Sequence, residues 1–336
     1  MARAFAILRA LALAYRRDWT AFQSLAGNNF FLLTAFLLRE AGTFVYLIMG
    51  LVVLFPLSTD PLRKIPPSRL ALWPLDRRER WILRLASPWI NPLTWGLAGL
   101  AVWGAGRILT VGMWAAIAGL CAGVFLISAV PLPGGSGMWR RMPQFPGPLN
   151  QLVRKNLREI LTTLDFYCAL ILSAAVLACR VFASGLPREA LMAMTVLVVG
   201  AMSSYAQCLF GLDGEGGLSR YRLLPVRGWQ LLLAKDAAFL AVVIPLTLPL
   251  AVLPGIGAAL VTLAVGHLPS VEHPRPQTRW RFSTGGGLGN GAIQLLALAM
   301  TASGIFLTSA WFLAPAVAAW AVSVWWYGRD VERVLG

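Results

Sequence analysis

The stretch ALMAMTVLVVGAMSSYAQCLFGL, from Ala190 to Leu212, contains no charged residue. A helix needs roughly 20 consecutive apolar residues to cross a bilayer core about 30 Å thick. Further apolar blocks of similar character run from Gly42 to Leu57, Ile108 to Val130, Phe166 to Cys179 and Ala237 to Leu253. A water-soluble protein has nowhere to bury so many such blocks. The sequence therefore predicts an all-α, polytopic integral membrane protein.

The composition supports this class and excludes others. Hydrophobic residues make up 58% of the chain and charged residues 13%, against roughly 25% charged in an ordinary soluble domain. The net charge of +15 is explained by Lys and Arg in cytoplasmic loops beside anionic lipid, so the lipid bilayer is an expected partner and nucleic acid is not. The cysteines lie separately in apolar blocks, where a thiol is a small packing residue, and they predict neither disulfides nor a metal site: Cys121, Cys168, Cys179 and Cys208.

About ten membrane crossings are expected, within a range of eight to twelve. They cover approximately 19–38, 41–58, 86–106, 108–131, 164–183, 189–210, 236–253, 255–268, 291–309 and 310–327. With ten crossings and both termini in the cytoplasm, all but four of the 29 Lys and Arg residues face inside, the exceptions being Arg39, Arg107, Arg180 and Arg188. This arrangement predicts a multi-pass protein of a bacterial cytoplasmic (inner) membrane.

A loop dense in Pro and Gly, PLPGGSGMWRRMPQFPGP from Pro131 to Pro148, divides the chain near its middle. We expect an N-terminal membrane half at 1–131 with about four helices, a cytoplasmic linker at 132–149, and a C-terminal half at 150–336 with about six. Residues 1–17 form an amphipathic pattern, with Leu8 and Leu11 on one face and Arg9 on another. That pattern predicts a helix lying in the membrane interface.

The two halves share a short similarity. SRLALWPL at 68–75 matches SRYRLLPV at 219–226 at a constant offset, with identical Ser68/Ser219, Arg69/Arg220, Leu72/Leu223 and Pro74/Pro225. Both copies lie in a basic loop after the second crossing of their half. This placement predicts a partial internal repeat of parallel orientation.

The second copy belongs to the stretch FGLDGEGGLSRYRLLPVRGWQLLLAKDAAF, from Phe210 to Phe239. A crossing ends there in a Gly-rich acidic turn, and a short amphipathic piece and a basic run lead into the next crossing. Two interpretations stay open on these residues alone. The segment offers a partner protein both charge and apolar area, or it is a loop whose arginines touch lipid phosphates.

This stretch resembles the loop between the second and third helices of ABC-2-type transporter permeases. The matching features are the acidic-Gly turn 213–217, the element Leu223-Leu224-Pro225-Val226 and Lys235. Residues 150–327 also suit the six-helix layout of that family, while the first half departs from it with four crossings. The resemblance implies a permease subunit of an ATP-driven (ABC) transporter, an exporter coupled to a separate ATPase subunit, with a second permease copy as a further candidate partner. It assigns ATPase contact to Asp213, Glu215, Arg220, Arg222, Leu224, Pro225 and Arg227, and to Arg69 and Pro74 in the first copy.

No enzyme activity is expected from this chain. Its three lysines follow Arg63, Arg154 and Ala234, so none belongs to the Gly-x-x-x-x-Gly-Lys loop that cradles phosphates. We expect no bound cofactor, no metal and no catalytic residue in this chain. ATP is expected to be bound and hydrolysed by the partner subunit.

The alternative function is a secondary transporter, or another polytopic membrane protein, that works without an ATPase. The sequence counts against it because we expect no carboxylate in the middle of the membrane. Asp165 and Asp236 are expected at cytoplasmic helix starts, and His267 and His273 at the membrane interface.

Overall fold

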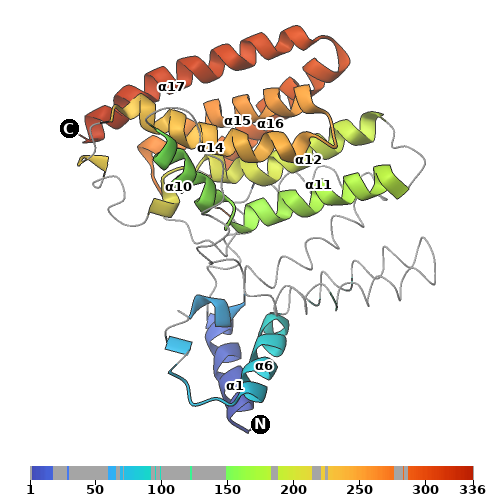
Figure 1. Cartoon of the computed structure of the whole chain (residues 1–336), viewed down its shortest axis with the longest axis vertical. Coiled ribbons are helices and arrows are strands. Elements are labelled where there is room, and N and C mark those ends of the chain that lie inside the picture. Colours follow the sequence, from blue (N-terminus) through green and yellow to red (C-terminus); the bar gives the residue numbers. More distant parts are fainter. Residues whose placement is uncertain are drawn as a thin grey trace. The chain divides into compact units, whose positions relative to one another are not determined.

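The computed structural model describes residues 2–17, 29, 60–65, 69–70, 72–91, 95, 99, 122, 149–182, 188–213, 221–223, 226–275, 283 and 287–335. Within these ranges every regular element is a helix (Figure 1). Outside these ranges lie the expected crossings 19–38 (except Asn29), 41–58 and 108–131 (except Ala122), most of the one at 86–106, and nearly all of the linker.

The N-terminal elements are α1 (Ala2–Arg17), η1 (Pro61–Lys64), α6 (Arg77–Ala86) and η2 (Ser87–Ile90). The C-terminal elements are α10 (Asn150–Ile160), α11 (Leu164–Phe182), α12 (Arg188–Ala206), η3 (Gly211–Asp213), α14 (Gly228–Thr247), α15 (Val252–Glu272), α16 (Leu288–Leu307), η4 (Ala310–Phe312) and α17 (Leu313–Leu335). Of the described helices, five are long and apolar enough to cross a membrane, namely α12, α14, α15, α16 and α17. The expected class, a helical integral membrane protein, is thereby supported, and the ten crossings and the internal repeat stay predictions.

Two helix starts differ from the expected ones. Helix α14 begins at Gly228, eight residues before the expected crossing, because the Gln230 side chain accepts a hydrogen bond from the Arg227 N–H at 2.9 Å and caps the helix. Helix α15 begins at Val252, and Pro254 lies in its first turn. A proline there sacrifices no intrahelical hydrogen bond. Pro254, the residue left between the expected crossings 236–253 and 255–268, therefore belongs to α15.

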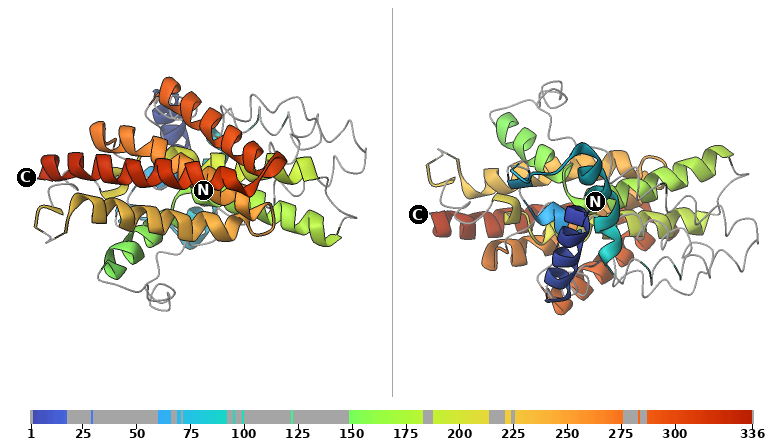
Figure 2. Two further views of the ribbon diagram at one scale, coloured as in Figure 1. Left: turned by 90° about the horizontal axis from the view of Figure 1, so that it is seen from above. Right: turned by 90° about the horizontal axis from the view of Figure 1, so that it is seen from below.

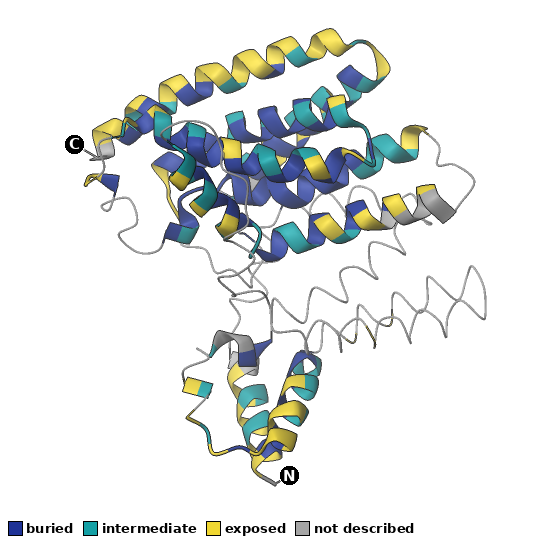
Figure 3. Cartoon of the chain, viewed as in Figure 1, coloured by how far each residue is buried: buried dark blue, intermediate teal, exposed yellow. Residues whose placement is uncertain are grey.

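The chain divides into two compact units, one of Met1–Gln23 with Leu37–Gly134 and one of Ser24–Phe36 with Gly135–Gly336. In the second unit α15 is packed against α12, α14, α16 and α17. Helices α12 and α15 are largely buried, whereas α17 keeps an exposed outer face (Figure 3). Helix α17 runs along the unit over α14 and α15 (Figure 2).

Helices α12 and α15 approach closely at Gly266. A Cβ placed on Gly266 would lie 2.5 Å from the backbone oxygen of Ala206. Small residues permit such close backbone contact between apolar helices, which depend on packing rather than on the hydrophobic effect for their association. The close contact between α12 and α15 therefore requires a glycine at position 266.

Polar side chains join the interior helices. Gln294 on α16 donates to the Thr262 carbonyl at 2.7 Å, and its Oε1 accepts from Gln207 at 2.6 Å and from Asn29 at 2.7 Å. Asn29 also binds Ser203 and Ser204 on α12. Because Asn29 and Gln294 are buried, these bonds satisfy polar groups that would otherwise be costly in an apolar interior.

The first unit has its own small core. Ala4 of α1, Leu62, Leu75 and Leu83 of α6 form a buried cluster, against which Ile7, Leu8 and Leu11 pack. The face of α1 expected to enter lipid thus has a partner within the protein. The helix expected at residues 1–17 is present as α1, and its location at the membrane interface stays a prediction.

Candidate functional site

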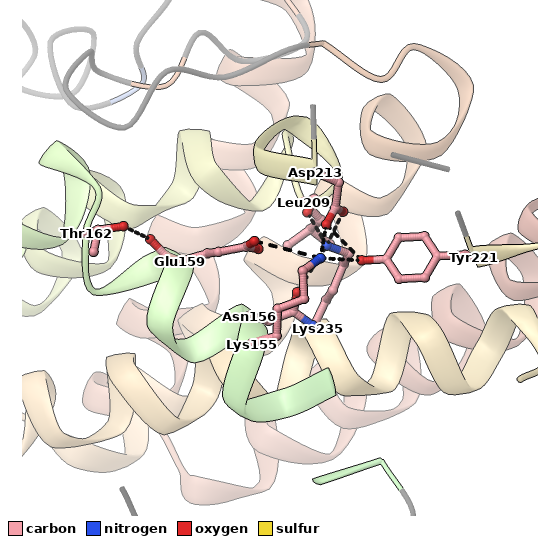
Figure 4. A network of polar contacts seen from close by, with 8 residues as sticks. All are labelled: Lys155, Asn156, Glu159, Thr162, Leu209, Asp213, Tyr221 and Lys235. Atoms are coloured by element: carbon pink, nitrogen blue, oxygen red, sulfur yellow. Dashed lines mark hydrogen bonds and ion pairs between the residues drawn. The ribbon is translucent and has the colours of Figure 1, made fainter. Parts of the chain in front are cut away.

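A buried ion-pair cluster forms around Asp213, at the end of η3 (Figure 4). Its Oδ1 accepts hydrogen bonds from Lys155 of α10 and from the Tyr221 hydroxyl, the latter at 2.8 Å. Its Oδ2 accepts from Lys235 of α14 at 2.8 Å. One carboxylate therefore connects α10, η3, the segment at Tyr221 and α14.

Lys235 has a partner for each of its three ammonium hydrogens. Besides Asp213, these are the Leu209 carbonyl at 2.7 Å and the Asn156 side-chain oxygen at 3.3 Å. The side chain is 2% exposed, and its ammonium lies 4.8 Å from the centre of the Phe210 ring. A buried charge is tolerated only when it is paired and hydrogen-bonded in this way.

The cluster shifts the titration of the groups around Asp213. Burial of the Asp213 carboxyl opposes its ionisation, but the Lys235 charge and the Lys155 hydrogen bond outweigh it and hold the pKa of Asp213 below its ordinary value. Burial lowers the pKa of Lys155, and the bonds to Asp213 and Tyr221 overcome this and raise it well above the ordinary value. Burial and the Asp213 charge raise the pKa of Tyr221. At neutral pH Asp213 is thus a carboxylate bound to the Lys155 ammonium, with a neutral Tyr221 phenol.

The residues after Tyr221 are exposed. Tyr221 is buried and held by Asp213 and by Lys155, whose ammonium donates to its hydroxyl at 3.0 Å. Arg222 is exposed, and the Leu223 side chain is 86% exposed. An anchored residue followed by an exposed arginine and leucine presents charge and apolar area at a fixed place, as a docking segment for a partner requires. We call residues 221–223 the docking segment.

The predicted partner contacts fall into three groups. Arg222 and Arg227 are exposed. Asp213 is engaged within the chain, because its side chain is 2% exposed and binds both lysines; it anchors the docking segment in place of facing a partner. Glu215, Arg220, Leu224 and Pro225 lie outside the described residues.

The predicted contacts of the first repeat copy lie in the first unit. Arg69 and Pro74 are exposed, and the Pro74 carbonyl accepts from Arg3 at 3.4 Å. Leu72, which corresponds to Leu223 in the sequence similarity, is 81% exposed. The two copies thus share an exposed leucine at the same position.

Sequence reasoning did not identify Lys155 or Tyr221 as functional residues. One available signal was the scarcity of lysine, since Lys64, Lys155 and Lys235 are the only lysines among 29 basic residues. Two of these three converge on Asp213. Lys155 and Lys235 lie 58 and 22 positions from Asp213 in the sequence. No local sequence pattern could therefore have predicted these contacts.

A second polar cluster contains Asp236, a carboxylate that was expected at a helix start and instead lies inside a helix. Asp236 is the ninth residue of α14 and is fully buried. Its Oδ1 lies 3.0 Å from Nε2 of the equally buried His267 of α15, and its Oδ2 accepts from the Trp320 indole at 2.8 Å. His267 Nδ1 lies 2.7 Å from the Ser323 hydroxyl. Asp236 was expected at a helix start because the crossing was predicted to begin at residue 236, whereas α14 begins at Gly228. The position of Asp236 and His267 relative to the membrane surface stays a prediction.

Asp165, the other carboxylate expected at a helix start, does lie in the first turn of α11. It is fully buried and accepts hydrogen bonds from the backbone N–H and the hydroxyl of Ser283. The carboxylate therefore ties α11 to the segment that precedes α16.

Comparison of the chain with protein-family models, with curated proteins and with solved structures gives no match.

Proposed function

We propose that this chain is the membrane-spanning permease subunit of an ATP-driven transporter and that the docking segment, residues 221–223, contacts a separate ATPase subunit. The observation that carries this proposal is the combination of an anchored Tyr221 with an exposed Arg222 and Leu223. A loop that only touched lipid phosphates would need the arginine, but neither the buried anchor nor the exposed leucine.

The anchor gives the docking segment a mechanical connection to the membrane helices. A displacement of Tyr221 acts on Asp213, and through it on Lys155 of α10 and Lys235 of α14. The contact between Asp213 and Lys235 is charged and buried, so it is strong compared with a surface ion pair. The contact with Lys155 is weaker, because the Lys155 side chain is 44% exposed. Movement of an ATPase against the segment would therefore be transmitted to both helices, which are also packed on each other.

Export, or extraction of a lipid-like or amphipathic substrate, is the direction that fits the described connections. The residues between α14 and α15 are only 248–251, and those between α16 and η4 are only 308–309. These connections offer no room for a binding domain that would capture a ligand for import. The first repeat copy, with exposed Arg69 and Leu72, supplies a second surface of the same chemistry for the ATPase.

The test is affinity purification of the detergent-solubilised wild type beside the variant Arg222→Glu/Leu223→Asp, with mass spectrometry of the co-purified proteins. We expect the wild type to retain a P-loop ATPase and the variant to lose it. Both substituted side chains are exposed, so the variant should fold. Arg333→Glu is a matched control, because Arg333 is an exposed arginine on α17 outside the segment.

Two results count against the proposal. One is a wild type that retains no P-loop ATPase under conditions in which it stays folded. The other is an ATPase that the docking variant retains as well as the wild type does, which would place the contact elsewhere on the chain.

A secondary transporter is the second candidate function, and the Asp236–His267 pair favours it. Ionisable residues within membrane helices are costly and are often part of a proton or ion path. Asp236 is a buried carboxylate inside α14, a helix that is long and apolar enough to cross a membrane, and it is the residue that such a path would use.

A further inference from the structure

The cluster of Asp236, His267, Trp320 and Ser323 joins three membrane helices and has no part in the docking segment. Asp236 belongs to α14, His267 to α15, and Trp320 and Ser323 to α17. Each contact of His267 in the cluster crosses from one helix to another. The cluster therefore connects α15 to both α14 and α17.

The hydrogen bonds determine how many protons the cluster holds. The Ser323 hydroxyl has one hydrogen, and it donates this hydrogen to the Ala264 carbonyl at 2.8 Å, because a carbonyl can only accept. The 2.7 Å contact between Ser323 Oγ and His267 Nδ1 then requires Nδ1 to carry a hydrogen and donate it. These two contacts therefore assign a hydrogen to Nδ1 of His267.

The remaining contact needs one further proton. At 3.0 Å, His267 Nε2 and Asp236 Oδ1 bind each other only if one of them carries a hydrogen. Without it two lone pairs would face each other in a fully buried site, and the carboxylate would be an uncompensated buried charge. With it the pair is neutral overall, whichever of the two atoms carries the hydrogen.

We propose that Asp236 and His267 form a proton-binding site within the membrane helices, and that the bound proton holds α14 against α15 and α17. Loss of the proton breaks the contact between Nε2 and Oδ1 and loosens the packing of these helices. The inference does not depend on an ATPase partner, so it stands or falls separately from the proposed function.

No other described cation is placed to replace the proton. Lys235 precedes Asp236 on α14, but its ammonium is bound to Asp213, Leu209 and Asn156. From α17 the Tyr327 ring faces His267 edge-on, with its centre 6.5 Å away. The other described charged or titratable groups on the helices packed around the pair are Arg188, Glu189 and Tyr205 on α12, Glu272 on α15, and Arg329, Asp330, Glu332 and Arg333 on α17. Lys155 and Glu159 on α10 belong to the Asp213 cluster.

The chain of Ser323, His267 and Asp236 is not a hydrolytic triad. A nucleophilic serine must give its hydrogen to the histidine as it attacks, whereas Ser323 donates to a backbone carbonyl and accepts from the ring. All three side chains are buried among helices. Proton binding is the chemistry that remains.

Two variants at position 236 separate the proton from the hydrogen bonds. In Asp236→Asn the amide NH₂ donates to His267 Nε2 and the amide oxygen accepts from Trp320, so every contact is kept without a carboxyl group that can ionise. Asp236→Ala removes the contacts altogether. The asparagine variant is therefore a permanently closed form, and the alanine variant an open one.

Nuclear magnetic resonance of the full chain in lipid nanodiscs, labelled with ¹⁵N-histidine and ¹³C-aspartate, observes the site directly. The chain has only two histidines, so His273→Gln leaves a single histidine signal, that of His267. Asp236 is identified as the carboxyl signal lost in Asp236→Asn. Spectra recorded between about pH 5 and 10 report which atom carries the proton.

We expect the wild-type spectra to show one proton held between the two side chains, with a hydrogen on Nδ1 and a second one on either Nε2 or the Asp236 carboxyl. Wherever the spectra report loss of that second proton, the apparent melting temperature of the wild type should fall relative to that of Asp236→Asn. Asp236→Ala should melt below both.

The proposal is overturned if the wild-type spectra show an ionised Asp236 beside a neutral His267 ring at every pH, since the pair would then hold no second proton. It is also overturned if the wild type and Asp236→Asn lose stability in parallel as pH rises, since the bound proton would then not hold the helices. The wild-type spectra decide the first point even if a variant fails to fold.

Discussion

Lysine has a particular use at Asp213 in a chain whose other basic residues are almost all arginine. An ammonium group is a compact charge with three donor hydrogens, whereas a guanidinium is a planar fork that suits bidentate contacts. Lys235 directs its donors to a carboxylate, a carbonyl and an amide that lie in different directions. An arginine of greater length would not fit among them, which explains why this position does not follow the general preference of the sequence.

Removal of Asp213 should be far more damaging than removal of Lys155. Asp213→Ala leaves the buried Lys235 without its carboxylate, and such a change typically costs about 3–5 kcal/mol. The Lys155 side chain is 44% exposed, so Lys155→Ala should cost about 1 kcal/mol or less, as for a solvated ion pair. Thermal unfolding of both purified variants, followed by tryptophan fluorescence, measures the order.

A compensating double variant tests whether the unpaired charge of Lys235 causes the loss of stability in Asp213→Ala. Asp213→Ala/Lys235→Met removes both buried charges and should recover much of the loss, because apolar replacements of a buried pair are often neutral or stabilising. A double variant that unfolds no later than Asp213→Ala alone would contradict the ion-pair explanation.

The stability of the cluster should depend on pH in a direction set by Asp213. Its folded pKa lies below its ordinary value, about 3.9 in an unfolded chain. Its contribution is therefore fully present above that value and is lost as pH falls through the folded pKa. The difference in unfolding free energy between wild type and Asp213→Asn should stay constant from pH 7 to about pH 5 and shrink below pH 4. A difference that already shrinks between pH 7 and pH 5 would show that Asp213 is not held ionised.

At the scale of the helices, close packing makes a prediction at Gly266. Gly266→Ala places a methyl group 2.5 Å from the Ala206 oxygen, so α12 and α15 must move apart, and overpacking of this kind costs about 1–3 kcal/mol. Gly289→Ala in α16 is the control, because no atom lies within 4 Å of its added Cβ. Alanine there should be neutral or stabilising by up to about 1 kcal/mol. Equal melting temperatures of the two variants would contradict the close crossing.

The helices were predictable where an apolar block coincides with a whole helix. The expected segments 164–183 and 291–309 differ by at most three residues at either end from α11 and α16. The expected crossing at 236–253 began later than α14 does because Gln230 and Lys235 are polar. In the structure Gln230 caps the helix and Lys235 binds Asp213. Hydropathy cannot recognise a polar residue whose partner lies on another helix.

The site was predictable only in its exposed part. The segment containing Arg222 was identified from its alternation of basic and apolar residues, which depends on local sequence alone. The contacts of Asp213 with Lys155 and of Asp236 with His267 connect residues 58 and 31 positions apart. Such pairs are set by tertiary packing, which a single sequence does not contain.

At the scale of the C-terminal unit, the helix ends sort into two sets. Glu332 near the end of α17 accepts from the Gly228 N–H at the start of α14, at 3.1 Å, and Lys235 joins the same end to Asp213. At the opposite end Arg180 of α11 donates to the Pro249 carbonyl at 2.8 Å. The described basic residues at the first end are Arg154, Lys155, Arg158, Arg222, Arg227, Lys235, Arg275, Arg329 and Arg333, against Arg180 and Arg188 at the other.

This asymmetry predicts the orientation of the unit, since Lys and Arg accumulate on the cytoplasmic side. Single cysteines at two highly exposed positions test it in a background without the native cysteines: Leu223→Cys at the basic end, and Trp311→Cys at the opposite end, where Trp311 is 84% exposed. A membrane-impermeant maleimide added to intact cells should label Trp311→Cys and leave Leu223→Cys unlabelled until the membrane is permeabilised. The reverse pattern would place the docking segment outside the cell, where no ATPase could reach it, and would remove the basis of the proposed function.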